Sequence, residues 1–133
     1  MPALEGLIGT WRTIADFPHA DMGEAEGRTT FEWLLGGAFV LQRASAPHPA
    51  APDGHCILTE DTQHYFDSRG IVRTYAMTFD GDVWTLERGA QPGSEWAQAF
   101  RAERDGDDRW VGAWRREQDG AWIHDFDLIY ERV

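Results

Sequence analysis

Residues 105–133 decide the fold, and they read DGDDRWVGAWRREQDGAWIHDFDLIYERV. Two Asp-Gly pairs, Asp105-Gly106 and Asp119-Gly120, stand on either side of a segment in which apolar and polar residues alternate. Asp-Gly between alternating segments is a strong signal for a tight hairpin turn. Alternation with period two sends successive side chains to opposite faces of a strand. We therefore expect antiparallel strands over Arg109–Glu117 and Trp122–Glu131.

The same pattern continues toward the N-terminus, where turn signals recur at intervals of about 10–14 residues. Many antiparallel strands with few helices hide their edges completely when the sheet closes on itself. We therefore expect an all-β protein, a closed antiparallel up-and-down barrel of about ten strands. The remaining strands are expected at Thr10–Phe17, Arg28–Leu35, Ala38–Ala46, Gly54–Glu60, Gln63–Asp67, Ile71–Phe79, Val83–Arg88 and Ser94–Arg104.

Two segments stand outside this alternation. Pro2–Ile8 predicts a short helical turn that caps one end of the barrel. His48–Gly54 predicts a loop, because its prolines cannot donate to a strand ladder. No change of composition marks a linker, so residues 1–133 are expected to form a single domain.

The charge of the chain argues against two classes of partner. Acidic residues number 23 against 12 basic ones, which gives a net charge of −11. Such a charge repels phosphate backbones and anionic lipid surfaces, so we expect no nucleic acid and no membrane partner. The first residues also lack the basic start and apolar run of a signal peptide. Cys56 is the only cysteine, which favours a cytoplasmic location.

Several motifs carry a family resemblance. Gly9-Thr10-Trp11 is similar to the Gly-x-Trp opening of calycin barrels, the group of lipocalins and fatty-acid-binding-like proteins. Four further motifs follow in the order seen in one bacterial family: FEWLLGGAF at 31–39, HYFDSRG at 64–70, DGAW at 119–122 and HDFDL at 124–128. Over nearly its whole length the chain resembles this DUF1579-like, lipocalin-like family. The resemblance implies a calycin-type barrel, and it supplies no established activity or catalytic residue.

A more distant similarity is to nitrobindins, which are ten-stranded barrels that bind haem through a histidine near the C-terminus. His124 lies near the C-terminus of this chain. Trp11 is followed by Arg12-Thr13-Ile14 instead of the glycine- and proline-containing segment of nitrobindins. Haem held by His124 is therefore one hypothesis, and otherwise no cofactor is expected. The spacing of the five histidines predicts no metal site.

The barrel interior is the expected ligand site, because a barrel of about ten strands is wide enough to leave a cavity. Alternation places Arg73 and Tyr75 on one face with Met77. A guanidinium that faces an apolar interior needs a carboxylate from the protein or from a ligand. The other reading is an arginine at the barrel rim, paired with a surface acid. His64 is a second histidine that alternation sends inward.

The expected ligand is a small apolar or aromatic molecule, with or without a carboxylate. Seven tryptophans exceed what a small core requires, which suits the lining of a cavity. The expected apolar contacts are Trp11, Met77, Trp84, Trp110, Trp114, Trp122 and Phe126. The expected polar contacts are Arg73, Tyr75, His124 and Tyr130.

Two alternatives to a binding module stay open at this level. The first is an enzyme of cyclase, isomerase or hydratase type, with His124 as acid or base and Tyr75 or Arg73 stabilising an oxyanion. The second is a structural role for a filled barrel. Either a monomer or a homodimer is consistent with the sequence.

Overall fold

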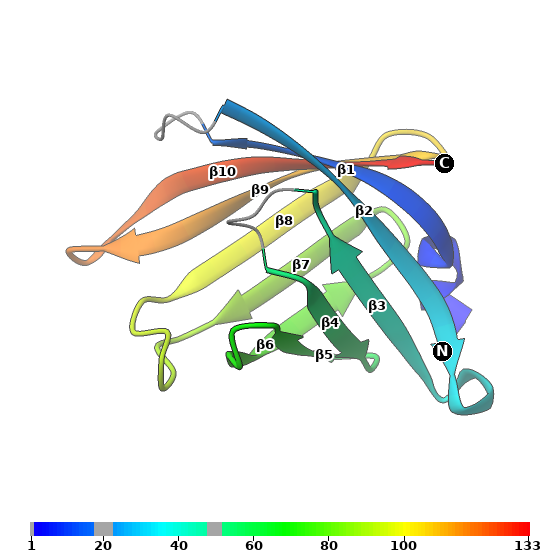
Figure 1. Cartoon of the computed structure of the whole chain (residues 1–133), viewed down its shortest axis with the longest axis horizontal. Coiled ribbons are helices and arrows are strands. Elements are labelled where there is room, and N and C mark those ends of the chain that lie inside the picture. The colour runs from blue at the N-terminus through cyan, green and yellow to red at the C-terminus, as the bar shows by residue number, and fades with distance from the viewer. Residues whose placement is uncertain (1, 18–22, 48–51) are drawn as a thin grey trace.

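The computed structural model, which describes residues 2–17, 23–47 and 52–133, is a closed antiparallel barrel (Figure 1). Each strand pairs with its neighbours in the chain, and β1 pairs with β10 to close the ring. The strands are β1 Gly9–Phe17, β2 Gly23–Leu34, β3 Phe39–Ser45, β4 Gly54–Leu58, β5 Thr62–Asp67, β6 Val72–Phe79, β7 Val83–Arg88, β8 Gln98–Arg104, β9 Arg109–Gln118 and β10 Ala121–Arg132. The predicted all-β up-and-down barrel of ten strands is confirmed.

One end of the barrel is closed by the N-terminal segment, seen in blue at the right of Figure 1. Pro2–Leu7 forms the 3-10 turn η1, close to the predicted helical turn over Pro2–Ile8. Leu4 and Leu7 are each 1% exposed, and the Leu7 carbonyl accepts a 2.8 Å hydrogen bond from Trp11 Nε1. Arg132 of β10 donates to backbone carbonyls of Gly6 and Ile8 and so fastens the turn to the barrel.

The core fills this closed half. Residues that pair directly across a ladder point to the same face of the sheet, and the fully buried side chains identify the inward face. Aromatic rings meet there mostly edge to face or tilted, as Trp84 does with Phe31, Phe100 and Trp110. Trp84 Nε1 is the only buried side-chain nitrogen or oxygen in the described ranges without a hydrogen-bond partner.

Strand bounds differ from the expected ones where a partner strand decides them. β2 begins at Gly23, five residues before the predicted start at Arg28, because β1 supplies ladder partners for Gly23–Gly27. β8 begins at Gln98 and not at Ser94, because 89–97 leave the ladder to form the β7–β8 loop. Of the loop predicted over His48–Gly54, residues 48–51 lie outside the described residues, while Gly54 already belongs to β4.

A β-bulge in β10 changes which side chains face inward. His124 pairs with Arg115 of β9, whereas Phe126 pairs with Trp114, so Asp125 is an extra residue between them. Trp114 and Arg115 are adjacent and therefore lie on opposite faces. His124 consequently points to the outer face, while Phe126 points inward.

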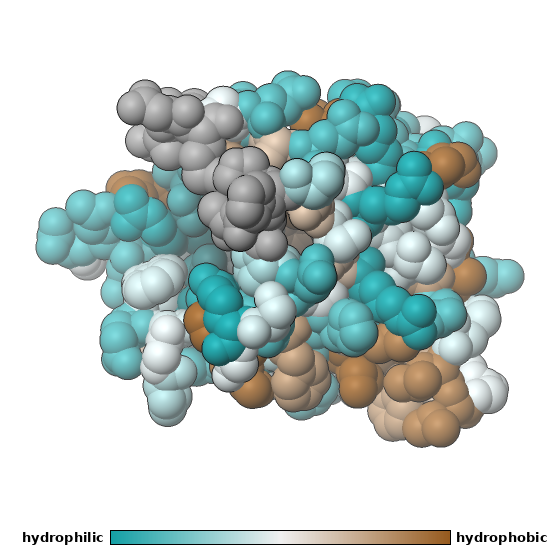
Figure 2. All heavy atoms as spheres, viewed as in Figure 1, coloured by the Kyte–Doolittle hydropathy of each residue, from teal (hydrophilic) through white to brown (hydrophobic). Residues whose placement is uncertain are grey.

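The outer face is largely polar, and the face shown in Figure 2 is mostly hydrophilic, with apolar residues gathered at the lower right. That corner lies over the β2–β3 turn, the 3-10 turn η2 at Leu35–Gly37, where Leu35 is 74% exposed. None of the helices in the described ranges is long and apolar enough to span a bilayer.

Candidate functional site

Burial falls in steps along the barrel axis, from the closed end to the other end, which we call the open half. Deep inward side chains are 0–2% exposed: Trp11, Phe31, Val40, Leu58, Trp84 and Trp110. A middle layer is 3–6% exposed: Gln42, Cys56, Gln63, Tyr75 and Tyr130. In the open half, inward side chains are only half-buried: Thr13, Ala15, Ala25, Ala44, Trp114 and Phe126. These last side chains point into the barrel and are less completely covered than the two layers below them.

Arg73 is the central polar group of the open half. It lies on β6 opposite Tyr65 of β5 and on the face of Tyr75, so it points inward. Its Nε donates to Ser94 Oγ at 2.7 Å, and its guanidinium lies 5.5 Å from the centre of the Tyr65 ring. No described residue hydrogen-bonds or ion-pairs with its terminal Nη atoms. These Nη atoms keep some contact with solvent, because Trp84 Nε1 is the only side-chain nitrogen or oxygen in the described ranges that is both fully buried and without a hydrogen-bond partner.

Arg88 is a second inward arginine, and it is 4% exposed. Its Nη1 donates to the carbonyls of Gly89, Ser94 and Trp96 at 3.1, 3.1 and 2.8 Å, and its Nε and Nη2 donate to Gln98 Oε1 at 3.1 and 2.5 Å. All of these acceptors are neutral. The guanidinium therefore holds the β7–β8 loop in place and leaves a positive charge that no described carboxylate compensates.

The β7–β8 loop in turn contacts Thr74 and Arg73 of β6. Gln91 extends its amide along β6, donating to the Thr74 carbonyl at 2.8 Å and accepting from the Thr74 N–H at 3.0 Å. Ser94, fully buried, receives Arg73 Nε. Because both loop contacts reach the same strand, the Arg73 guanidinium is fixed before any ligand arrives.

One acidic group near this end, Asp67, is already paired with a base. The Asp67 side chain is inaccessible to solvent and accepts from Arg69 at 2.6 Å and from the Tyr65 hydroxyl at 2.7 Å. The Arg69 hydrogen bond chiefly holds the pKa of Asp67 well below its usual range, and burial opposes it. Burial, followed by the bond to Asp67, raises the pKa of the Tyr65 phenol. Asp67 is thus neutralised by Arg69 and is not a counter-ion for Arg73.

Facing these polar groups is an aromatic wall. Phe17 of β1 stacks on Phe126 of β10 with ring centres 4.6 Å apart, and Trp114 of β9 lies beyond at 6.4 Å from Phe126. Trp114 meets Tyr75 edge to face at 5.5 Å across the barrel. The Tyr75–Trp114 contact forms a floor, above which Arg73 stands on one side and Phe126 on the other.

Below that floor the middle layer is polar. Gln63 Nε2 donates to Gln42 Oε1 at 2.8 Å, and Tyr130 lies in the same layer at 6% exposure. Burial is the main cause that raises the pKa of Tyr130, and Cys56 adds to it. Burial also raises the pKa of the Cys56 thiol to about 12, so this thiol stays protonated at neutral pH.

The structure divides the residues predicted to meet a ligand. Arg73, Trp114 and Phe126 come together in the open half, while Tyr75, Met77 and Tyr130 lie below them at 3%, 3% and 6% exposure. Trp11, Trp84 and Trp110 pack into the closed half at 0–2% exposure and are shielded from the open half by the layers above them. Three of the seven tryptophans thus build the packed core, whereas Trp33, Trp96 and Trp122 are 40%, 43% and 42% exposed.

Three side chains predicted to face inward lie on the outer wall instead. The bulge at Asp125 turns His124 outward, where its Nε2 lies 2.8 Å from Asp127 Oδ1. Trp122 shares that face and is 42% exposed, with the Arg115 guanidinium 5.7 Å from its ring centre. His64 pairs with Ile57 and Thr74, a position on the outer face. The predicted inward orientation of all three is wrong.

Two functional candidates went unpredicted, Arg88 and Gln98. The sequence does contain a signal for Arg88. It lies two residues from Leu86 and four from Trp84 on β7, so it faces the same side of the strand as these two apolar, buried residues. Gln98 lacks such a signal, since the irregular segment before it hides the register of β8. In the described ranges no group of three His, Cys, Asp or Glu side chains is placed to hold a metal.

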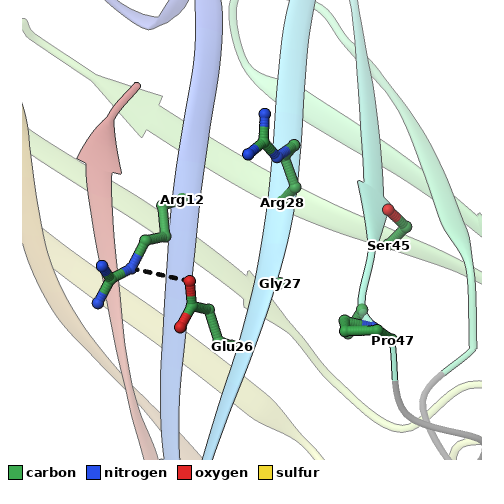
Figure 3. Close-up of a pocket in the computed structure, with 7 residues that line it drawn as sticks. Arg12, Glu26, Gly27, Arg28, Ser45 and Pro47 are labelled. Carbon is green, nitrogen blue, oxygen red and sulfur yellow. Dashed lines mark ion pairs between the residues drawn. The ribbon is translucent and has the colours of Figure 1, made fainter.

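A hollow lies on the outer wall where β2 separates from β3, and Figure 3 shows its lining. Its volume is about 540 Å³, and Arg12, Arg28 and Ser45 are among the residues around it. Arg12 is already paired with Glu26 at 3.2 Å, with side chains 48% and 62% exposed. Exposed ion pairs contribute little and are screened by salt, so this groove is the weaker candidate.

Comparison with known proteins bears on the fold. No protein-family model matches the chain, and no curated protein shows significant sequence similarity to it. The crystal structure of Rv2717c from M. tuberculosis aligns over 100% of this chain and 98% of its own, with a TM-score of 0.63 and 18% identity. The likeness is one of fold. The open half of the barrel therefore has to be interpreted from its own side chains.

Proposed function

We propose that the protein binds a small organic carboxylate with an apolar body in the open half of its barrel. The observation that carries this proposal is Arg73, a guanidinium fixed by Ser94 and Tyr65 whose two Nη atoms are accessible and unpaired among the described residues. A guanidinium presents two parallel donors that match a carboxylate bidentately. A ligand carboxylate would complete the hydrogen bonds of Arg73.

Charge and shape around Arg73 support the same class of ligand. Arg88 adds a buried positive charge with only neutral acceptors, and Asp67 is neutralised by Arg69. The interior thus carries positive charge in a chain whose net charge is −11. The wall of Phe17, Phe126 and Trp114 offers apolar surface beside the cation, so one molecule with an anionic and an apolar end satisfies both.

Chemistry at His124 inside the barrel is not part of the proposal. Both haem ligation and acid–base catalysis were hypotheses that required this imidazole to face the interior, and the bulge directs it outward to Asp127. We also infer a cytoplasmic protein, since the unpaired Cys56 thiol is compatible with a reducing compartment.

Isothermal titration of the purified protein with benzoate and with octanoate tests the proposal. At least one of the two is expected to bind, and Arg73→Gln should weaken that binding by about 10- to 100-fold, the loss of charge-assisted hydrogen bonds. Arg43→Gln is the matched control, because Arg43 is 55% exposed and pairs with Glu32 on the outer wall. Failure of both anions to bind, or equal binding to the Arg73 variant, would overturn the proposal.

A further inference from the structure

Strand β2 is paired along both of its edges over only part of its length. β1 pairs with Gly23–Phe31, whereas β3 pairs with Arg28–Leu34. On the side of β3, the backbone N–H and C=O groups of Gly23–Gly27 therefore have no ladder partner among the described residues. A free strand edge of this kind is a template to which another extended segment can add.

The separation of β3 from β2 has a local cause. Continuing the β2–β3 register would set Pro47 opposite Glu26, and a proline has no N–H to donate to a ladder. The chain turns inward instead. The Ser45 carbonyl oxygen lies 2.6 Å from the position that a Cβ on Gly27 would take, on the side of the inward Thr13. This bend leaves the hollow of about 540 Å³ in Figure 3 beside the free edge.

The outward side chains at this edge are acidic. Glu24 stands directly opposite Asp16 of β1, which in turn stands opposite Asp127 of β10. Like charges in opposite positions destabilise a sheet. Glu24 and Asp16 are exposed, and neither has an ion-pair partner in the part of the chain that the structure describes. Because Glu26 is already paired with Arg12 at 3.2 Å, the need for a cation is concentrated at Glu24.

The inward side chains at this edge are small. Gly23, Ala25 and Gly27 alternate along it, and Ala25 pairs with Ala15 of β1. Both alanines belong to the half-buried inward layer of the open half. An apolar side chain brought opposite Ala25 would cover this layer, and the burial of apolar area favours its addition.

A second copy of the same edge is a disfavoured occupant. In a two-fold antiparallel pairing, the residues of β2 would face the same residues of the other copy in reverse order. A pairing centred on Glu24 or on Glu26 sets that glutamate against its own copy. A pairing centred on Ala25 sets Glu24 against Glu26 twice. Each of these registers opposes like charges, so the edge requires a partner with a different charge pattern.

We infer that β2 accepts an extended segment of another protein as an added strand along Gly23–Gly27. The segment runs antiparallel to β2, because it takes the place that β3 leaves and β3 is antiparallel. It carries a basic residue opposite Glu24 and an apolar residue opposite Ala25. Backbone hydrogen bonds supply the affinity, and these two side chains supply the specificity. The net charge of −11 favours the approach of a basic segment.

Fluorescence anisotropy with two labelled peptides, TATVKVT and TATVEVT, tests the inference. In the antiparallel register their fifth residue, lysine or glutamate, lies opposite Glu24. The lysine peptide should bind the natural chain about tenfold more tightly, because one attraction replaces one repulsion. Glu24→Lys should reverse this preference. Glu117→Lys is the control, since it makes the same change of charge at an exposed position of β9 and should keep the preference.

Hydrogen exchange distinguishes strand addition from a contact between side chains alone. The lysine peptide should slow amide exchange within Gly23–Gly27, where the new ladder forms. Failure of the lysine peptide to bind, equal affinity for the two peptides, a preference that Glu24→Lys does not reverse, or unchanged exchange at this edge would each overturn the inference. The binding of carboxylates at Arg73 is independent of all four outcomes.

Discussion

Replacing Arg88 by methionine should unfold the β7–β8 loop and cost about 3 kcal/mol of stability. Methionine keeps the apolar stem of the side chain and removes every donor. The Gly89 and Trp96 carbonyls then lose the Arg88 donor, while the Ser94 carbonyl and Gln98 Oε1 keep only the Gln91 N–H and the Tyr75 hydroxyl. Each orphaned acceptor costs about 1–3 kcal/mol. Burying the Arg88 charge itself costs desolvation free energy. Its removal therefore offsets part of that loss, which gives the net value of about 3 kcal/mol.

Urea unfolding followed by tryptophan fluorescence measures this loss, and the midpoint of thermal unfolding should fall by about 10 °C for a domain of this length. The control is Arg101→Met on β8, whose side chain is 54% exposed and pairs with Glu103, so its replacement should cost less than about 1 kcal/mol. If Arg88→Met lay within about 1 kcal/mol of the natural chain, Arg88 would not organise the loop.

Three further outcomes follow from the packing and the titrations. Gly112→Ala should cost about 1–3 kcal/mol of unfolding free energy in urea, because the new Cβ would lie 2.7 Å from the Cβ of Ala102. Gly89→Ala is the control and should leave the unfolding free energy nearly unchanged, because nothing lies within 4 Å of the added Cβ. Equal costs for the two variants would contradict the close approach of β8 and β9. Cys56, with its pKa raised to about 12, should react with a thiol reagent only after unfolding, and rapid labelling of the native protein would refute its burial. Asp67 has a folded pKa below its unfolded value of about 3.9, so its contribution to stability is complete above that pH and is lost as the pH falls below it. Asp67→Asn should therefore flatten the acid part of the curve of stability against pH, and an unchanged acid limb would refute this role.

The barrel itself could be predicted because alternation and turn chemistry act locally and agree along the chain. β7 begins and ends at the residues expected, Val83 and Arg88. Gly23–Gly27 could not be assigned in the same way, because its glycines and glutamates have little strand propensity. Those residues are extended because β1 offers a complete ladder beside them, and that pairing is a property of the fold and not of the segment.

The site was predictable as far as strict alternation holds. Alternation correctly predicted that Arg73 and Tyr75 face inward, because β6 is regular from Val72 to Phe79. It failed for His124 because one extra residue at the bulge inverts the face of every preceding position in the strand, and such an insertion leaves no trace in composition.

The pairing of β1 with β10 has a consequence for how the chain reaches its native state. The first and last strands of the barrel are neighbours, with Trp11 opposite Arg132, so the ring cannot close until β10 has been synthesised. Until then the nascent chain presents two unpaired edges, β1 and β9, and unpaired edges are the surfaces on which strands of other chains add. The β1–β10 pairing also joins segments at opposite ends of the chain, and contacts of such large sequence separation form slowly. The sheet therefore stays open for nearly the whole of translation, and pairing of the final strand closes it into a ring.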